Sequence, residues 1–424
     1  MQLDNYKKDR LCYILEETFN YLIGILLAES YLAKLTSSLG ISDSLTAILS
    51  TFVTLGCCTQ LLTGVFFKRG KAKKRVTGFF VLNQLLFMLL YLVPFVQIPN
   101  GLRVALFVVL LLFGHFSLNI ALAPRTNWFM SFVDDHKRGI FTAKKEAISL
   151  VTGIVFQMSM GAVIDRFEAQ GNIRGAFIVC AIVIFALSVG HTLSLIFTKD
   201  RELPTNDRSL VKGIGDILRD KKVRPLLILS GLWGITHSIA IPFFGTYKIK
   251  ELGFSMSFLA VMSLVTAVSR ITASVFLGRY ADKHSFAKML KLCYWAVTMG
   301  YAVAVFLRPE NGYVLYPLYT MLEAIAMGGI NSAVINLIFD YVVPEKRTLT
   351  LAVRQTIYGI FGFLTSTLAA PLLQLIQNAG NRFLGMQVYG QQVLSFLALL
   401  CTLILILYVN RAVIRLRPLD KESV

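Results

Sequence analysis

Charged residues are scarce in this chain. Lys, Arg, Asp and Glu make up 16% of its 424 residues, whereas a soluble globular protein carries about 25%. Apolar residues supply 55% of the chain, and uncharged stretches such as VALFVVLLLFG at 104–114 recur along it. This composition excludes an ordinary soluble domain and predicts an all-α polytopic membrane protein.

Motifs for enzymatic chemistry are also lacking. The chain has no GxxxxGK[S/T] loop for ATP, no nucleophile motif and no cluster with metal-ligand spacing, so we expect no enzyme, no cofactor and no metal site. Gly213-Ile214-Gly215 lacks the third glycine of a dinucleotide fingerprint and is interpreted as part of a linker. The six cysteines form no CxxC pair, and we expect small buried side chains at Cys12, Cys57, Cys58, Cys180, Cys293 and Cys401.

Acidic residues are few, 24 against 42 basic ones, which gives a net charge of +18. A nucleic-acid surface would not accompany such long apolar runs, so we expect no nucleic-acid partner. A window of about 20 residues instead predicts a series of membrane-spanning helices. Twelve spans are expected, at 11–36, 44–67, 76–97, 103–132, 139–164, 173–198, 223–248, 256–278, 286–307, 313–342, 348–376 and 387–411.

The basic residues indicate the orientation of these spans. With twelve spans, most Lys and Arg fall on one side, including the segments 68–75, 199–224 and 279–291. The positive-inside rule therefore predicts that both termini are cytoplasmic, in a plasma or inner cell membrane, with anionic lipid against the basic face. The polar start leads directly into a long span with three glutamates, so we expect no cleavable signal peptide.

Two stretches of the sequence recur at a nearly constant offset. Residues 39–44, LGISDS, recur as LGFSMS at 252–257, and the stretch from Phe132 to Arg138 corresponds to the stretch from Tyr341 to Arg347. Such a duplication predicts two parallel six-helix halves. We expect the halves at 1–198 and 223–424, joined by a cytoplasmic linker at 199–222.

The segment GRYADK at 278–283 resembles the Gly-x-x-x-Asp-Arg/Lys loop motif of the major facilitator superfamily, and with the repeat it makes the whole chain resemble that family. In the first half the same loop has Lys68 where the acid would stand. The resemblance implies alternating access between two halves, with helices 1, 4, 7 and 10 lining a central cavity. It assigns a conformational role to Gly278, Arg279, Asp282 and Lys283, and we add the repeat-related loop residues Arg138 and Arg347.

Ionisable and polar residues inside the spans are the candidates for function, because charge in a bilayer is costly. Glu16, Glu17, Glu29, His115, Arg125, His237 and Glu323 all fall on the cavity helices that the resemblance implies. We expect solute binding by His115, Asn119, Arg125, Trp233, His237, Asn331 and Asn20, and proton coupling by Glu323, Glu146 and Glu29. The alternative is that these groups are satisfied structurally within one half, and for Glu16 and Glu17 pairing with basic loops is an equal possibility.

Arg125 and Glu146 are equidistant from the turn between the fourth and fifth spans. Residues equidistant from an antiparallel turn lie at similar depth. We therefore expect an ion pair between them, serving either the site or the packing of the two helices. Glycines 328, 329, 359 and 362, with the amides Asn83, Gln84 and Gln157, are interpreted as helix-packing residues.

These features favour a secondary transporter that moves a small polar organic solute, a sugar or organic acid, together with protons. The fifth span has no proline and so lacks the Gly-Pro motif of the superfamily's drug antiporters. Export of drugs or lipid-like molecules is the alternative within the transporter class, and a membrane sensor without transport is the alternative outside it. We expect the chain to act as a monomer.

Overall fold

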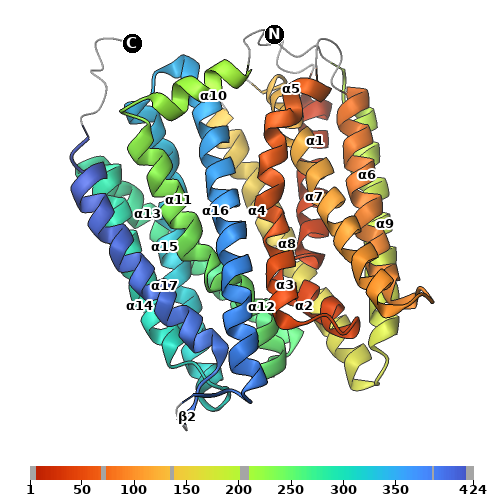
Figure 1. The fold of residues 1–424 in the computed structure, drawn as a ribbon. Helices are drawn as coiled ribbons and strands as arrows, with labels where there is room; N and C mark the ends of the chain where they lie inside the picture. The colour runs from red at the N-terminus through yellow and green to blue at the C-terminus, as the bar shows by residue number, and fades with distance from the viewer. Residues whose placement is uncertain (1–5, 68–72, 134–137, 201–209, 384–385, 417–424) are drawn as a thin grey trace. The chain divides into compact units, whose positions relative to one another are not determined.

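The computed structural model describes residues 6–67, 73–133, 138–200, 210–383 and 386–416, nearly all of which are helical (Figure 1). The chain divides into two compact units. Unit 1 comprises Met1–Ser42, Thr59–Asp207 and Ser255–Ala260, and unit 2 comprises Asp43–Cys58, Arg208–Phe254 and Val261–Val424. The expected all-α class is confirmed, and the short strands β1 (Arg382–Phe383) and β2 (Met386–Gln387) form one antiparallel hairpin.

Unit 1 is built from long apolar helices around an aromatic core. Its helices are α1 (Lys7–Leu26), α2 (Glu29–Ser38), α5 (Thr63–Phe66), α6 (Lys73–Leu92), α7 (Asn100–Met130), α8 (Arg138–Ala169) and α9 (Ile173–Phe197). Tyr13 stacks on Phe129 with ring centroids 4.5 Å apart, and Trp128 lies beside the same ring. Since α1 packs on α8 and α9, and α6 on α7 and α9, this core joins most of the unit.

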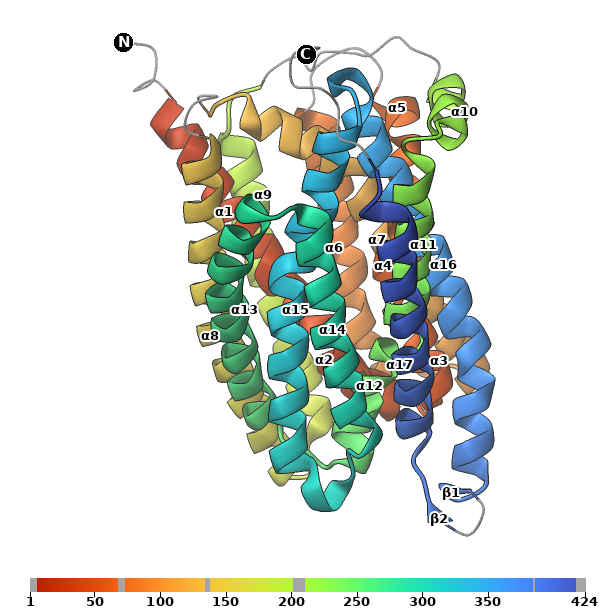
Figure 2. The ribbon, with the colours of Figure 1, turned by 90° about the vertical axis from the view of Figure 1, so that its left-hand side faces the viewer.

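Unit 2 contains the remaining helices. They are α3 (Asp43–Ser50), α4 (Phe52–Gly56), α10 (Leu210–Arg219), α11 (Arg224–Ser238), α12 (Phe244–Thr246), α13 (Met256–Lys283), α14 (Phe286–Val305), α15 (Gly312–Tyr341), α16 (Pro344–Asn378) and α17 (Gly390–Tyr408). The first turn of α13 is assigned to unit 1. Within unit 2, α14 packs between α15 and α17 (Figure 2), and α16 packs on α3, α4 and α11. The glycines 213 and 215 lie inside helix α10, so this part of the expected linker at 199–222 is helical.

Ten helical segments in the described part of the chain are long and apolar enough to cross a membrane, or eleven if α1 and α2 count as one broken span. Helix α14 corresponds to the expected ninth span and has 20 residues. It is less apolar than those ten because its sequence includes lysine, tyrosine and tryptophan. The structure therefore supports ten or eleven of the twelve predicted spans on length and composition.

The first span is bent where the sequence predicted one helix over 11–36. Helices α1 and α2 meet at an angle of 45°, with Ala28 in an extended conformation between them. Glu29 is consequently the first residue of α2 and is exposed. A carboxylate in the first turn of a helix is stabilised by the partial positive charge of that helix end, which gives Glu29 a structural reason to be there.

The repeated LG pair has the same backbone geometry in both copies. Gly40 has φ 68° and Gly253 has φ 64°, both in the left-handed region that glycine adopts without strain. Each follows a helical segment, and the residue after each glycine bonds back to that segment, Ile41 to Thr36 and Phe254 to Lys248. These are Schellman-type helix ends, so the sequence repeat corresponds to a repeated turn.

Close helix contacts in unit 2 depend on glycine, as was predicted for Gly328 and Gly359 but not for Gly234. A Cβ atom on Gly234 of α11 would lie 2.6 Å from the Tyr358 carbonyl oxygen of α16, and one on Gly328 would lie 2.8 Å from the Arg270 carbonyl oxygen. A Cβ atom on Gly359 would likewise collide with the Thr54 carbonyl oxygen. The glycines therefore allow α11, α4 and α13 to approach their neighbours at backbone distance.

Gly234→Ala should destabilise the protein, because the added methyl group collides with backbone that cannot rotate away. The expected loss is about 1–3 kcal/mol, as for an overpacked core, seen as a lower thermal unfolding midpoint in detergent. Gly78→Ala in α6 is the control, since a Cβ there meets nothing within 4 Å. Equal midpoints for the two variants would contradict the packing argument.

Candidate functional site

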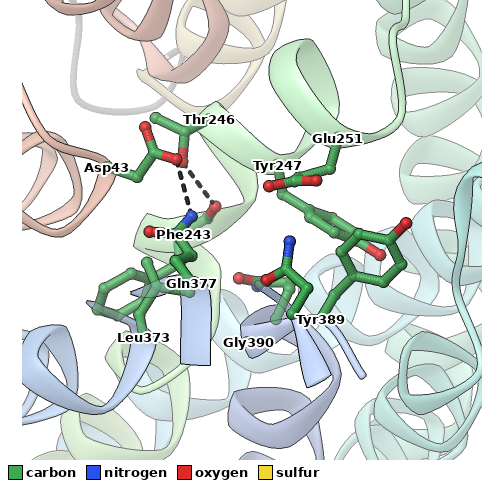
Figure 3. Close-up of a pocket in the computed structure, with 11 residues that line it drawn as sticks. Asp43, Phe243, Thr246, Tyr247, Glu251, Leu373, Gln377, Tyr389 and Gly390 are labelled. Carbon is green, nitrogen blue, oxygen red and sulfur yellow. Dashed lines mark hydrogen bonds between the residues drawn. The ribbon is translucent and has the colours of Figure 1, made fainter. Parts of the chain in front are cut away.

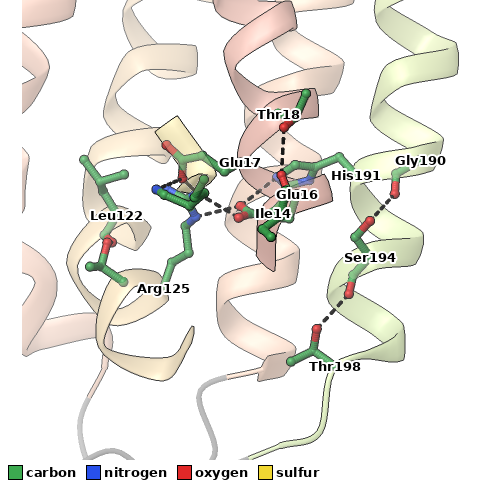
Figure 4. Close-up of polar contacts among 12 residues, drawn as sticks. Ile14, Glu16, Glu17, Thr18, Leu122, Arg125, Gly190, His191, Ser194 and Thr198 are labelled. Carbon is green, nitrogen blue, oxygen red and sulfur yellow. Dashed lines mark hydrogen bonds and ion pairs between the residues drawn. The ribbon is translucent and has the colours of Figure 1, made fainter. Parts of the chain in front are cut away.

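Three ionisable side chains meet in the interior of unit 1. The Arg125 Nε lies 2.6 Å from Glu16 Oε1, and Arg125 Nη2 donates to Glu16 Oε2 at 2.8 Å. His191 Nε2 lies 3.0 Å from Glu16 Oε1 on the other side (Figure 4). Glu16 and His191 are fully buried and Arg125 is 3% exposed. The carboxylate of α1 thus joins α7 and α9.

A second carboxylate extends this cluster toward α8. Glu17 also pairs with Arg125, and Lys145 Nζ lies 3.2 Å from Glu17 Oε2. The Arg125 guanidinium lies 5.6 Å from the centroid of Phe80, and Lys145 Nζ lies 4.8 Å from that of Tyr13. Buried charges are tolerated when opposite charges and hydrogen bonds reach them. We call Glu16, Glu17, Arg125, Lys145 and His191 the charge network.

Local sequence explains how the network forms. Tyr13, Glu16 and Glu17 are three and four residues apart, so they share one face of α1. Arg125 follows Pro124, which lies inside α7 and cannot donate to the Ile120 carbonyl. The Thr63 hydroxyl donates to that carbonyl at 3.0 Å instead. The Ile120 carbonyl is therefore still hydrogen-bonded one turn before Arg125.

The expected ion pair between Arg125 and Glu146 is wrong. Arg125 pairs with Glu16 and Glu17 of α1, and the Glu146 side chain is exposed. Equal distance from a turn fixes depth along two helices, but it does not fix which face each residue occupies. The sequence prediction chose the wrong neighbour for this reason, and it omitted Glu16 and Glu17 from the site.

The other predicted solute ligands of unit 1 are His115, Asn119 and Asn20, and the buried His115 Nδ1 has no hydrogen-bond partner among the described residues. His115 is 6% exposed and its ring lies 5.0 Å from Phe87 of α6. Asn119 donates to the His115 carbonyl at 2.9 Å and accepts from Gln60 Nε2 at 3.0 Å. Asn20 is half-buried on α1. The structure therefore places His115 and Asn119 together, packed against α6 and the Gln60 segment.

Unit 2 brings the predicted residues of α11 beside a tyrosine that sequence reasoning missed. Trp233 is 6% exposed, and its ring lies 5.3 Å from both His237 and Tyr294. The Tyr358 hydroxyl of α16 lies 3.2 Å from His237 Nδ1. Tyr358 follows Arg354 by one helical turn, so the charged residue was the signal that could have identified it.

Arg354 and Glu323 complete this cluster. Arg354 Nη2 donates to Gln355 Oε1 at 2.8 Å, whereas its buried Nε meets no acceptor among the described residues. Tyr294 and Tyr358 lie within electrostatic range of Arg354, and Glu323 lies within that of Tyr358 and Tyr301. We call Trp233, His237, Glu323, Arg354 and Tyr358 the recognition cluster. It combines aromatic faces, a guanidinium, an imidazole and a carboxylate.

Among the described side chains, no contact joins the remaining candidates to either cluster. Asn331 is exposed on α15, and Gly278, Arg279 and Lys283 lie at the exposed end of α13. The side chains of Asp282 and Arg138 are outside the described part of the structure. Arg347 donates to the carbonyls of Val342 and Phe339, both at 2.9 Å. Since these carbonyls end α15, Arg347 caps that helix with a positive charge.

Removing Arg125 should destabilise unit 1 strongly. Arg125→Gln leaves Glu16 buried without its main partner, and breaking such a pair costs about 3–5 kcal/mol. The double variant with Glu16→Gln removes both charges and should recover much of the loss in thermal unfolding midpoint.

The exposed Arg279→Gln controls for loss of a basic residue and should change the midpoint little. A double variant no more stable than the single one would show that Glu16 is not the group that Arg125 neutralises.

Solved structures share this fold at low sequence identity. A nucleoside transporter, NupG, has a TM-score of 0.67 at 14% identity, covering 98% of this chain and 100% of its own. The D-xylose-proton symporter has a TM-score of 0.62 at 14% identity, covering 94% and 96%. PepTSo, a transporter of the POT family, has a TM-score of 0.72 at 10% identity, covering 96% and 98%.

No curated protein sequence matches the chain significantly. Residues 11–366 match the sequence model of the Major Facilitator Superfamily. This match covers most of the chain, and the helical units and the apolar spans agree with it. The protein belongs to the major facilitator superfamily and is a multi-pass membrane transporter rather than an enzyme.

Proposed function

We propose that the protein is a proton-coupled secondary transporter of a small polar organic solute, a sugar or an organic acid, that works by alternating access. The observation that carries this proposal is the recognition cluster of unit 2. A tryptophan ring offers a stacking face, while His237, Tyr358 and Arg354 offer hydrogen-bonding groups beside it. A lipophilic cation would leave the buried Arg354 Nε without an acceptor, at a cost of about 1–3 kcal/mol.

Three of the structural neighbours carry solutes of this class, while others carry metal ions or peptides. One transports nucleosides, one carries D-xylose with protons and another is a fucose:proton symporter from E. coli. These solutes are hydroxyl-rich, as the recognition cluster favours. We therefore propose that this chain also couples the transport of a polar solute to the movement of a proton.

Glu323 is the proposed proton carrier. It lies on α15, half-buried, within electrostatic range of two tyrosines and of the cluster that would hold the solute. A carboxylate beside a solute site changes its proton affinity when the solute displaces water. The charge network of unit 1, by contrast, is neutralised internally, and we assign it to holding α1, α7, α8 and α9 together.

The wider arrangement is part of the proposal. We propose halves at 1–198 and 223–424 joined by the linker at 199–222, a monomer, and both termini on the cytoplasmic side of the cell membrane. Labelling of single cysteines introduced at Lys222 and Arg308 with a membrane-impermeant reagent would test the orientation, since these two positions are expected on opposite sides.

Solute binding should depend on the Tyr358 hydroxyl. Tyr358→Phe removes the hydrogen bond to His237 and should weaken binding by about 2–10-fold, the value of one such bond. Binding is measured as thermal stabilisation by D-xylose, L-fucose, uridine and lactate, with tetraphenylphosphonium as the lipophilic cation.

Tyr408→Phe is the matched control, because that hydroxyl bonds to the Pro225 carbonyl away from the cluster. If tetraphenylphosphonium alone stabilises the protein, the proposed solute class is wrong and drug-like export replaces it.

Glu323→Gln should separate proton coupling from solute movement. In liposomes, with the solute identified by stabilisation, the variant should lose uptake driven by a proton gradient while retaining exchange of labelled for unlabelled solute. Glu310→Gln removes an exposed carboxylate of the same unit and should leave uptake intact. Accumulation by the Glu323→Gln protein at the wild-type level would exclude this residue as the proton carrier.

A further inference from the structure

A cavity separate from the recognition cluster lies within unit 2 (Figure 3). The start of α3, the chain from Phe243 to Glu251, the end of α16 and the start of α17 surround it. It holds about 250 Å³ of space, part of which is open to solvent. Only about 10 Å³ of it admits the centre of a water-sized sphere, close to the least that one water molecule needs, so this cavity suits an occupant no larger than a water molecule or a small ion.

The lining of the cavity is rich in hydrogen-bond acceptors. Gln391 is 2% exposed, and its Nε2 donates to the Ala240 carbonyl at 2.9 Å while its Oε1 has no partner among the described residues. The Asn381 Oδ1 likewise has none. The Glu251 carboxylate, which accepts a hydrogen bond from Asn381, lines the same space.

The charges around the cavity leave one negative charge uncompensated. Asp43 accepts from Lys250 Nζ at 2.5 Å and from Gln377 Nε2 at 2.9 Å, so its carboxylate is neutralised and bonded. Figure 3 shows Asp43 and Gln377 facing each other on one side, with Tyr247 and Tyr389 on the other. Glu251 remains as the carboxylate without a basic partner in the lining.

We propose that this cavity binds one monovalent cation, such as Na⁺, through Glu251, Gln391 Oε1 and Asn381 Oδ1. A single water molecule can donate only two hydrogen bonds, whereas a carboxylate and two amide oxygens together offer more than two acceptor positions. One water molecule therefore leaves some of these oxygens unsatisfied. Hard cations take oxygen ligands of these types. One net negative charge matches a monovalent ion. The described residues hold no group of three or more His, Cys, Asp or Glu side chains that suits a transition metal.

The cation site stands independently of the solute and of the proton carrier. It joins the ends of α16 and α17 to the segment from Phe243 to Glu251, so a bound ion would tie these elements together. Binding to the folded state alone raises the unfolding temperature by mass action. The inference is therefore testable without any knowledge of the transported solute.

The test is thermal unfolding of the purified full-length protein at fixed pH, with NaCl, KCl or NH₄Cl replacing choline chloride at constant ionic strength. We expect a saturable rise of about 3 °C or more with one of the three cations. No rise with any of them, as for a cavity filled only by water, would overturn the proposal. So would a rise that does not saturate, as for a general salt effect.

Glu251→Gln and Gln391→Met should each weaken the apparent affinity for that cation at least tenfold. Their matched controls are Asp216→Asn, which removes an exposed carboxylate of α10, and Gln60→Met, which changes a glutamine of unit 1 that bonds to Asn119. Both controls should keep the wild-type response. Equal losses in controls and cavity variants would show a remote effect and reject the site.

Should a cavity variant fail to fold, equilibrium binding of ²²Na⁺ to the wild-type protein supplies the second measurement. Saturable binding near one ion per chain, displaced by excess unlabelled Na⁺ but not by choline, supports the site. Absence of saturable binding of ²²Na⁺, together with absence of stabilisation by K⁺ or NH₄⁺, rejects it.

Discussion

Neutralisation of buried charge is the constraint on which unit 1 depends. Glu16 and His191 are fully buried and Arg125 nearly so. Each would be costly alone in an apolar bundle, and their pairing removes most of that cost. Because the partners come from α1, α7 and α9, with Lys145 of α8 reaching Glu17, the network sets the register of four helices at once. The aromatic core around Tyr13 and Phe129 packs against it.

Unit 2 meets the same constraint less completely. Arg354 has a buried Nε without an acceptor among the described residues, and its neighbours are tyrosines and an amide rather than a carboxylate in contact. A buried polar group without a hydrogen-bond partner is stabilised when a bound solute supplies that partner. The charge network also has a buried nitrogen without a partner among the described residues, His191 Nδ1, but its arginine is balanced by two contacting carboxylates. This difference in charge balance supports the assignment of solute recognition to unit 2 and of a framework role to the charge network.

Particular residues show why part of this was predictable from sequence. Gly40 and Gly253 stand in a repeated hexapeptide, and both adopt the left-handed conformation. Gly359 and Gly328 were predicted at close helix contacts, and a side chain at either would meet backbone. Such residues act through local geometry, which a sequence pattern carries. Trp233 and His237 were also predicted together, since a separation of four residues on one helix sets their proximity.

Partners on different helices were not predictable in the same way. Arg125 was expected to meet Glu146 and pairs with Glu16 and Glu17 instead, because depth along a helix does not specify the facing side. Tyr358 was missed, although Arg354 one turn away marked its helix. The bend at Ala28 was missed as well, since no proline or glycine stands there to signal it.

The sequence by itself determined the membrane class, most of the helical spans and the repeated turns at Gly40 and Gly253, because apolar run length and the position of a turn glycine are local properties of the chain. The tertiary structure alone decided which charges neutralise each other, which polar groups remain unsatisfied and where acceptors converge on a cavity. Those outcomes depend on the rotation of each helix about its axis, which is set by packing against neighbours that are distant in the sequence.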